Sequence, residues 1–465
     1  MNRCLFILLT VSACKVSKNI ETPKPALPDN FRNAAVTGDT TSIASLQWNS
    51  FFMQADLQKL IDSAIIRNYD LQVALKNIEA SRLLFKQVKW NYVPQADLNV
   101  SANSYRYSNN SLNGLSANQY LGGANVNNFS ADVSLSWEAD IWGKIHNQQK
   151  SAFAAYLQTA EAKKLIQTNI VASVSQGYYN LLMLDEQLNI AQTNVKLNDS
   201  TLHIIRLQYD AGQVTSLAVE QSEAQLQAAA ELVPQFEQNI TLQENALRIL
   251  TGTLPGKVER STTLEQIPVP AGLYAGVPSA ILSRRPDVKS AELSLVIANA
   301  NVGISKAAMY PSLSITADGG LNSFRASNWF NIPSSLFGVV GGSILQPLLD
   351  HKTLSTQYQV AEVEREKAVI QFRQTVLNAV GEVSDALVKI EKLKQQQAIA
   401  ASRVSTLQHA TANASLLFKN GMANYLEVIT AQSNVLQSEL ELASIKRDEL
   451  TAVSDLYRSL GGGWR

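Results

Sequence analysis

The stretch LLMLDEQLNIAQTNVKLNDSTLHIIRLQY (residues 181–209) decides the fold of this chain. Its apolar residues recur in alternating steps of three and four, which is the heptad spacing of an α-helix that packs along a partner helix. A second apolar stripe runs beside the first, so we expect neighbouring helices on both sides, with a long helix in an ordinary bundle as the alternative. The first stripe contains Leu181, Leu184, Leu188, Ala191, Val195, Leu202, Ile205 and Tyr209, and the second contains Met183, Ile190, Leu197 and Ile204.

The helical pattern extends in both directions from this stretch. It runs from residue 145 to 209, and at about 1.5 Å per residue such a helix is about 100 Å long. Gly212 follows, and glycine can adopt the left-handed conformation that ends a helix. We predict a return helix from about residue 215 to 250, interrupted or kinked at Pro234.

Two segments upstream of the long helix alternate between polar and apolar residues, which is the period of a β-strand with one apolar face. We predict strands near residues 95–107 and 129–137. The loop between them, residues 108–128, is rich in Gly and Asn and carries no charge. Strands of this length joined by a long polar loop are typical of a membrane β-hairpin.

The order of elements in the first half of the chain occurs again in the second half. Asp287 begins a helix and follows Asp70 by 217 residues. Pro311 ends that helix and follows Pro94 by the same interval. This periodicity indicates a tandem duplication.

The second copy predicts elements equivalent to those of the first. Strands are expected near residues 312–321 and 337–345, and a second long helix is expected over residues 351–418. We assign residues 48–265 to the first repeat and residues 266–465 to the second. Each repeat contains a helix, two strands, a long helix and a return helix.

The N-terminus has the pattern of a signal peptide. One positive charge and a short apolar run precede two small residues and Cys14. The tetrad Val11-Ser12-Ala13-Cys14 resembles the bacterial lipobox, in which the cysteine becomes the lipidated N-terminus of the mature chain. We expect residues 1–13 to be the signal peptide and residues 14–47 to be a lipidated tether. An ordinary signal peptide followed by a chance cysteine is the alternative.

Composition narrows the class of protein. The chain has 39 basic and 39 acidic residues, so there is no electrostatic case for nucleic acid as a partner. Charged residues make up 17 %, and Gln, Asn and Ser carry much of the polarity. No apolar run reaches the roughly 18 residues of a membrane-spanning helix, so any membrane span must be a closed barrel of strands.

The number of strands indicates an assembly of several chains. Four strands cannot close a membrane barrel, since the smallest barrels have about eight, whereas three chains would supply about twelve. We therefore predict a mainly α protein with a small β part. Long coiled-coil helical hairpins would form a trimeric α-barrel, and four strands per chain would contribute to a 12-stranded membrane β-barrel. A soluble periplasmic coiled-coil scaffold capped by the strands is the alternative.

Several motifs occur in a specific order along this duplicated frame. After the lipobox come SWEADIWGK (136–144), LTG (250–252), LSRRPDV (282–288) and LYRSLGGGW (456–464). With these motifs the chain resembles, over essentially its whole length, the TolC/OprM-like outer membrane factors, in particular their lipoprotein (NodT-type) branch. The resemblance implies a homotrimer in the outer membrane with a periplasmic helical tunnel. It also implies docking to a periplasmic adaptor (membrane fusion) protein and to an inner-membrane pump of the resistance-nodulation-division type.

The resemblance also implies a docking site at the periplasmic ends of the helical hairpins. In that family these ends meet the adaptor protein. The residues assigned to this role are Gly212, Gln213, Gly421 and Met422. The alternative for both glycines is that they only stop their helices.

The same hairpin ends constrict the pore in that family. The resemblance assigns this constriction to Phe418, Glu427 and Thr430. Three copies of Glu427 would form an acidic ring, and such a ring attracts cations. The alternative for Glu427 is an ordinary solvated side chain on a helix surface.

No catalytic constellation is present in the sequence. The four histidines are scattered without metal-ligand spacing, and phosphate-loop and nucleophile motifs are absent. We interpret the basic pair Arg284–Arg285 as packing at the midpoint of the duplication. The expected protein is not an enzyme and binds no cofactor or metal apart from the covalent lipid on Cys14.

The function predicted from the sequence is that of a passive outer-membrane channel of a tripartite efflux pump. It would carry small molecules from the periplasm to the exterior, anchored by lipid in the outer membrane. A duct for type I protein secretion and the soluble periplasmic scaffold are the alternatives.

Overall fold

The computed structural model describes residues 27–28, 30–32, 42–270 and 274–465. Helices account for 68 % of the chain, and the remaining regular structure is one small sheet. The predicted signal peptide and Cys14 lie outside the described residues, as does most of the predicted tether.

The chain divides into two compact units. The sheet unit contains Glu79–Leu157 and Glu292–Ile370, and the helical unit contains Gln158–Ala291, Gln371–Arg465 and the described part of Lys24–Ile78. The two longest helices contribute residues to both units. Each unit is described by itself below.

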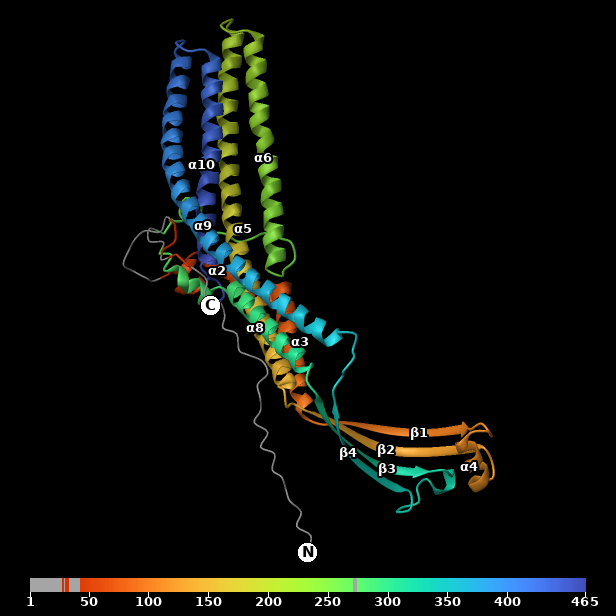
Figure 1. Cartoon of the computed structure of the whole chain (residues 1–465). Helices are drawn as coiled ribbons and strands as arrows, with labels where there is room; N and C mark the ends of the chain where they lie inside the picture. The colour runs from red at the N-terminus through yellow and green to blue at the C-terminus, as the bar shows by residue number, and fades with distance from the viewer. Residues whose placement is uncertain (1–26, 29, 33–41, 271–273) are drawn as a thin grey trace. The chain divides into compact units, whose positions relative to one another are not determined.

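The sheet unit contains four antiparallel strands in the order β1-β2-β3-β4 (Figure 1). They are β1 (Gln95–Arg106), β2 (Asn125–Ala139), β3 (Ser312–Ser323) and β4 (Leu336–Leu345). The predicted strands are thus present with small shifts of their ends. Within the described residues, β1 and β4 each pair with one strand only, so the sheet has two open edges.

The register of the strands separates the sheet into an apolar face and a polar face. One row across the sheet is Val100, Ala131, Leu321 and Leu336, and these side chains share the apolar face. Alternation places side chains of the opposite parity on the polar face, which carries Asn, Ser and Asp and no Lys or Arg. The apolar face is not covered: Leu98, Val100, Val340 and Ile344 are 61–81 % exposed.

Two features of the sheet differ from the sequence-based expectation. Residues 108–128 contain a helix, α4 (Leu112–Leu121), where a loop was predicted. Ser111 caps its first turn by accepting a hydrogen bond from the N–H of Gly114, and Gly122 ends it with φ 72°. In β4, Phe337 and Val339 identified the strand, but they pair with Gly320 and Asp318 on the otherwise polar face.

The segment between β2 and the long helix α5 (Lys144–Asp210) is fixed by the SWEADIWGK motif. Asp140 accepts hydrogen bonds from the N–H groups of Ile145 (2.8 Å) and His146 (2.9 Å) and so caps the helix. The indole of Trp142 donates to the carbonyl of Pro311 at 2.7 Å. These contacts anchor the turn between β2 and α5.

Four long helices dominate the chain: α5, α6 (Ser216–Leu250), α9 (Thr353–Lys419) and α10 (Tyr425–Ser459). Both α5 and α9 contain 67 residues, and both α6 and α10 contain 35. The helices that precede the strands also match, since α3 (Tyr69–Lys89) has 21 residues and α8 (Pro286–Ala307) has 22. The shorter helices are α1 (Trp48–Phe51), α2 (Ala55–Arg67), α7 (Ile281–Arg284) and the 3-10 turns Ile43–Ser45, Trp90–Tyr92, Pro278–Ala280 and Ala326–Asn328.

Two helix boundaries refine the prediction. The return helix α6 continues through Pro234 rather than being interrupted there. The second long helix begins at Thr353 instead of His351, because His351 and Lys352 have φ values of 56° and 64°. These values lie in the left-handed region and not in the right-handed helical region.

The helical unit buries most of the first apolar stripe of residues 181–209. Leu181, Ala191 and Ile205 are 0 % exposed, and Leu202 is 3 % exposed, whereas Tyr209 at the helix end is 47 % exposed. The one polar residue of that series, Asn198, is 2 % exposed. Its side-chain amide donates to the backbone and side-chain oxygens of Asn194, so its burial is compensated.

The main core of the helical unit joins segments that are distant in the sequence. It includes Leu57 of α2, Tyr178 of α5, Val376 of α9 and Leu456 of α10, each at most 1 % exposed. Tyr457 stacks on Phe51 with ring centroids 4.1 Å apart. Within the described residues, no helix is both long and apolar enough to cross a lipid bilayer.

Candidate functional site at the helical hairpin ends

The turn between α5 and α6 is a Schellman closure. Gly212 has φ 71°, and its N–H donates to the carbonyl of Tyr209 at 2.9 Å. The N–H of Gln213 donates to the carbonyl of Gln208 at 2.8 Å, which is the six-to-one bond of this motif. A side chain at position 212 would find nothing within 4 Å, so only the backbone conformation requires glycine there.

The turn between α9 and α10 repeats this geometry. Gly421 has φ 71° and donates to the carbonyl of Phe418 at 3.0 Å, while Met422 donates to the carbonyl of Leu417 at 2.8 Å. The side chain of Asn424 then caps α10 by accepting from the N–H of Glu427 at 3.1 Å. The predicted helix stops at both glycines are therefore present.

A small core joins the ends of the two hairpins. It is formed by Ile205, Ala218, Phe418 and Val428, which are 0–4 % exposed. One residue comes from each of the four long helices, so the two hairpins support one another at this end. The hydroxyl of Tyr425 also donates to the side-chain oxygen of Gln221 at 2.7 Å, which links α10 to α6.

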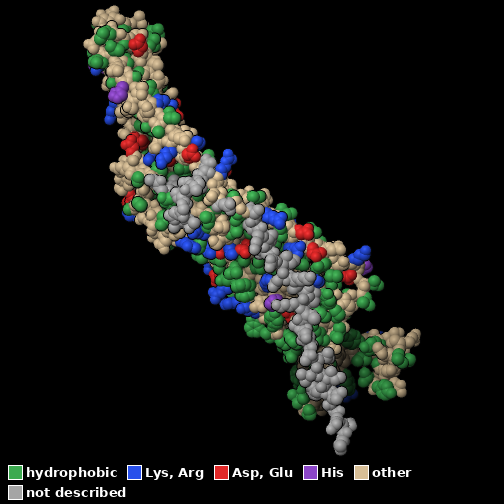
Figure 2. Space-filling model, turned by 60° about the vertical axis from the view of Figure 1, so that its left-hand side comes forward, with side chains coloured by type: hydrophobic (Ala, Val, Ile, Leu, Met, Phe, Trp, Pro, Cys, Tyr) green, Lys and Arg blue, Asp and Glu red, His purple; other side chains and the backbone are tan. Residues whose placement is uncertain are grey.

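The residues outside this small core leave an apolar surface at the hairpin ends. Figure 2 shows hydrophobic and uncharged side chains gathered at the top of the molecule, where these ends lie, with few charged ones. Met422 is 68 % exposed, the largest fraction in this set. The large apolar residues exposed by at least two fifths are Leu207, Tyr209, Leu217, Leu416, Leu417, Met422 and Leu426.

The structure separates the residues that the sequence assigned to the constriction. Glu427 and Thr430 are exposed on the first turns of α10. Phe418 is 4 % exposed and packs inside the small core, so its side chain does not face a free surface in this structure. The sequence could not reveal this, because Ile205 and Ala218, which help to cover Phe418, come from the other hairpin.

The residues assigned to docking lie together at the turns. Gly212, Gln213, Gly421 and Met422 are adjacent to the ends of their helices, and all four are exposed. They form the outermost part of each turn. Their positions make them accessible to a partner protein.

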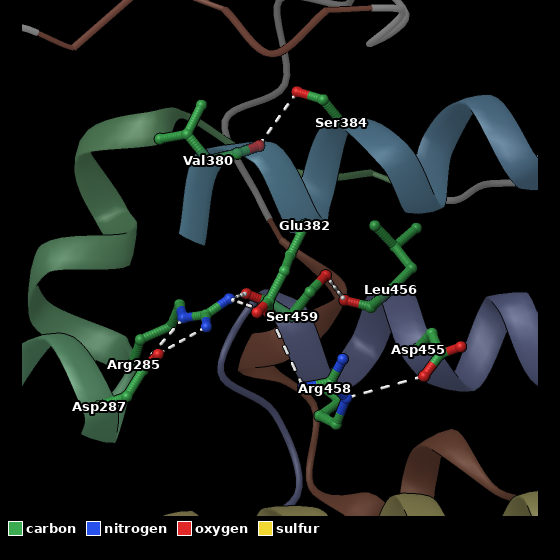
Figure 3. A network of polar contacts seen from close by, with 9 residues as sticks. All are labelled: Arg285, Asp287, Val380, Glu382, Ser384, Asp455, Leu456, Arg458 and Ser459. Carbon is green, nitrogen blue, oxygen red and sulfur yellow. Dashed lines mark hydrogen bonds and ion pairs between the residues drawn. The ribbon is translucent and has the colours of Figure 1, made fainter. Parts of the chain in front are cut away.

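A second polar site, shown in Figure 3, fastens the C-terminal end of α10. Arg285 is 5 % exposed and donates to both carboxylate oxygens of Asp287 (3.0 and 2.6 Å), to Glu382 (2.9 Å) and to the carbonyl of Ser459 (2.8 Å). Arg458 lies 3.8 Å from the same Glu382 carboxylate. Burial alone would raise the pKa of Asp287, but the guanidinium of Arg285 outweighs it and lowers that pKa below its ordinary value.

A third polar cluster joins the connector after α6 to the long helices. Arg260 donates to both carboxylate oxygens of Asp185 and to the carboxylate of Glu244, and it is 19 % exposed. Sequence reasoning did not identify this cluster, because its members are 16 to 75 residues apart. The only sign of this cluster in the sequence was that the connector after α6 contains charged residues. The arrangement holds the connector against α5 and α6.

A groove in the helical unit has mixed charge. It encloses about 720 Å³ and is lined by Glu186, Glu265, Glu439, Lys394 and Lys446 together with apolar side chains. Burial raises the pKa of Glu186, with smaller contributions from Glu265 and Glu439. Since the lysines offset much of the negative charge, the groove has no clear preference for a charged ligand.

Within the described residues, no group of three or more His, Cys, Asp or Glu side chains is arranged to hold a metal ion. The prediction that the protein binds no metal remains a prediction. The polar clusters around Arg260 and Arg285 are closed by their own ion pairs. Their arrangement is that of structural clamps rather than of sites with open ligands.

Comparisons with known proteins point to a single class. The family model described as "Outer membrane efflux protein" matches residues 60–253 and 277–462. The chain is 27 % identical to the cation efflux system protein CusC of Escherichia coli, over 99 % of this chain and 98 % of the relative. It is 25 % identical to the probable outer membrane lipoprotein SilC of Salmonella typhimurium, over 98 % and 97 % of the two chains. The solved structure of the Neisseria gonorrhoeae MtrE outer membrane channel has the same fold, with a TM-score of 0.86, 24 % identity and coverage of 97 % of this chain and 99 % of that chain.

Proposed function

Since this chain belongs to the outer membrane efflux protein family and is the passive outer-membrane channel of a tripartite efflux system, we propose that three copies assemble into one duct. The relatives cover nearly its whole length, which favours this function over the periplasmic scaffold. Membership in a family of channels is also consistent with a protein that is not an enzyme. The duct would conduct small molecules, while the energy comes from the inner-membrane pump.

The sheet carries the proposal of a trimer. Its apolar face is not covered by other parts of the chain, with Leu98 and Val340 74 % and 81 % exposed, and both edge strands, β1 and β4, lack a second partner within the described residues. In lipid, unpaired backbone groups cost several kcal/mol each, so such edges must be closed. Three sheets joined from β4 of one copy to β1 of the next would close a barrel of about twelve strands. The apolar face would then meet lipid and the polar face would line the pore.

The recurring elements support the proposal that the chain arose by tandem duplication. The first repeat would span residues 48–265 and the second residues 266–465. Both α5 and α9 have 67 residues, and the return helices α6 and α10 have 35 each. In a trimer, this arrangement supplies a ring of paired hairpins of equal length, which would form the periplasmic tunnel.

We propose that the chain is anchored by lipid on Cys14, after removal of residues 1–13, with residues 14–47 as a tether. The lipobox-like tetrad supports this, and the relative SilC is described as a probable outer membrane lipoprotein. Incorporation of labelled palmitate into the wild type and not into Cys14→Ser would test the anchor. Labelling that persists in Cys14→Ser would contradict it.

The hairpin ends are the proposed docking site for a periplasmic adaptor protein, which would couple the duct to a resistance-nodulation-division pump. The exposed apolar surface around Gln213 and Met422 supports this role, because isolated patches of this kind mark interaction sites. Gly212 and Gly421 would shape the turns. Among the relatives, CusC is described as part of a cation efflux system.

The constriction is proposed at the first turns of α10. Glu427 and Thr430 are exposed there and could line it, whereas Phe418 would support it from the small core beneath. Three copies of Glu427 would favour cations over anions. In planar bilayers, we expect Glu427→Gln to lower the cation preference and Thr430→Ala, its neighbour one turn away, to leave it unchanged.

The function is tested by purification and electrical recording. We expect heat-modifiable trimers in outer-membrane fractions and stepwise conductance when these trimers are reconstituted in planar lipid bilayers. The single observation that carries the proposal is the amphipathic four-stranded sheet with two open edges. Recovery of a monomer in the soluble periplasmic fraction, without conductance, would overturn the proposal.

A further inference from the structure

A hollow of about 520 Å³ lies in the sheet unit at the end of the strands near α4. Its volume falls in the range of about 300–1,000 Å³ that is typical of small-molecule sites. The strand register places Tyr105, Val126, Asn128 and Asn322 on the polar face of the sheet, whereas Asn127 pairs with Ser104 on the other face. The lining residues are Tyr105, Tyr107, Val126, Asn127, Asn128, Asn322, Ser323, Phe324, Asn328, Asn331, Ser334 and Ser335.

The chemistry of this wall is unusual for the chain. No lining side chain carries a formal charge at neutral pH, and the wall combines five asparagines, three serines and three aromatic residues. Asparagine and serine side chains each offer both donors and acceptors. Such a wall suits a ligand that is itself a mixed donor and acceptor without charge.

Part of the wall is a rigid frame. Asn322 donates to the side-chain oxygen of Asn128 at 2.9 Å across β2 and β3, and the hydroxyl of Ser335 donates to the carbonyl of Asn328 at 2.6 Å. Ser323 and Ser335 are 9 % and 6 % exposed. The N–H of Asn322 also donates to the carbonyl of Ser335 at 2.8 Å, which holds the loop after β3 against that strand.

Other groups of the wall are available to a ligand. Among the described residues, the side-chain amide of Asn331 and the hydroxyl of Tyr105 have no hydrogen-bond partner. Tyr105 is 49 % exposed, and its ring lies nearly parallel to that of Tyr107, with an interplanar angle of 18°. Phe324 is 50 % exposed, but the guanidinium of Arg325 lies over its ring at 5.3 Å. The open aromatic platform is therefore Tyr105.

We infer that this hollow binds an uncharged saccharide. A sugar ring presents an apolar face that packs on an aromatic ring and a rim of hydroxyl groups that donate and accept. Tyr105 supplies the aromatic surface, and Asn331 supplies polar partners. In the proposed barrel, this face of the sheet lines the pore, so the saccharide would lie near its mouth.

The saccharide could come from the medium or from the glycan part of a membrane lipid, and one experiment distinguishes them. The full-length trimer is purified in a detergent without a sugar head group, since alkyl maltosides would compete for the site. Saturation-transfer NMR is then recorded with maltotriose and with an uncharged oligosaccharide released from the glycan of an outer-membrane lipid. We expect transfer from at least one of the two, and the stronger signal identifies the source.

Matched variants locate the binding. We expect Asn331→Ala, in the loop between β3 and β4, and Tyr105→Ala, in β1, each to weaken binding about tenfold. Asn125→Ala and Tyr120→Ala, which do not line the hollow, should bind as the wild type does. Conductance in planar bilayers reports that each variant still forms the channel. Absence of transfer from both saccharides to the wild type, or equal binding by all variants, would overturn the inference.

Discussion

At the scale of single residues, Arg285 is a side chain on which four hydrogen bonds converge. It joins Asp287 at the start of α8, Glu382 of α9 and the last turn of α10, and it is 5 % exposed. Removing one partner of a buried ion pair leaves the others uncompensated. Its neighbour Arg284 is more exposed and serves as a control.

We expect Arg285→Ala to lower the free energy of unfolding by about 3–5 kcal/mol. Arg284→Ala should change it by less than about 1 kcal/mol. Chemical denaturation of the purified protein, followed by circular dichroism, measures both. Similar losses in the two variants would refute the clamp.

The same clamp predicts a dependence on acid. The pKa of Asp287 is lowered in the folded state, because Arg285 outweighs the effect of burial. Its contribution to stability is therefore present above the ordinary carboxyl pKa and is lost as the pH falls through the lowered value. Acid should destabilise the wild type more steeply than Asp287→Asn.

The pKa of Glu449 is shifted in the opposite direction from that of Asp287. It is 1 % exposed and one of its carboxylate oxygens has no hydrogen-bond partner among the described residues. Burial raises its pKa, although Lys446 and Lys394 oppose the change. The raised pKa means that its contribution to stability is present below the ordinary value and is lost as the pH rises through the folded value.

We therefore expect Glu449→Gln to stabilise the protein at pH 7.4, by about 1–3 kcal/mol. The difference from the wild type should shrink as the pH is lowered to 5. Thermal unfolding at the two pH values tests this, with the exposed Glu231→Gln as a control. A variant less stable than the wild type at pH 7.4 would count against a buried, uncompensated carboxylate.

At the scale of elements, the same substitution at two adjacent residues of β1 should have opposite effects on assembly, because the residues lie on opposite faces of the sheet. Val100 lies on the apolar face and Ser101 on the polar face. An arginine on a lipid-facing position of a barrel costs about 2–4 kcal/mol near the middle of the bilayer. We expect Val100→Arg to reduce the yield of trimer in the outer membrane sharply and Ser101→Arg to be tolerated, as measured by heat-modifiable mobility. If Ser101→Arg reduced the yield of trimer and Val100→Arg did not, the polar face and not the apolar face would meet lipid, which would contradict the proposed barrel.

The elements also show what could be predicted from the sequence. Periodicity identified the long helices and the four strands, because each has one face with a uniform environment. It missed α4, where Ser111 and Gly122 were valid capping signals but the amphipathic pattern was absent. It could not place Phe418 or Arg285, because their surroundings are assembled from residues that lie far apart in the chain.

At the scale of the whole molecule, the equal lengths of the hairpins have a mechanical role. The small core at their ends requires Ile205 and Ala218 of one hairpin to meet Phe418 and Val428 of the other. Removing one heptad from both arms of a single hairpin would withdraw its end by about 10 Å. That displacement would separate the two halves of this core.

We expect deletion of residues 192–198 and 222–228 to expose the hairpin ends, with faster tryptic cleavage after Arg206. Deleting the equivalent residues 401–407 and 431–437 as well should restore the wild-type rate, since both hairpins are then shortened alike. Limited proteolysis followed by mass spectrometry measures the rates. A double deletion cleaved as fast as the single one would show that matched length is not what protects the ends.

The two turns that close the hairpins have a consequence for recognition. Their backbones are the same, with Gly212 and Gly421 at φ 71° and the same pair of hydrogen bonds, but Gln213 stands where Met422 stands in the other. A partner protein therefore meets the same backbone shape at both turns. It can bind every turn through this shared backbone and still distinguish the two kinds by the side chain at this position. Exchanging Gln213 and Met422 would leave the shared backbone shape intact, and a partner that distinguishes the turns by these side chains would then bind each turn in place of the other.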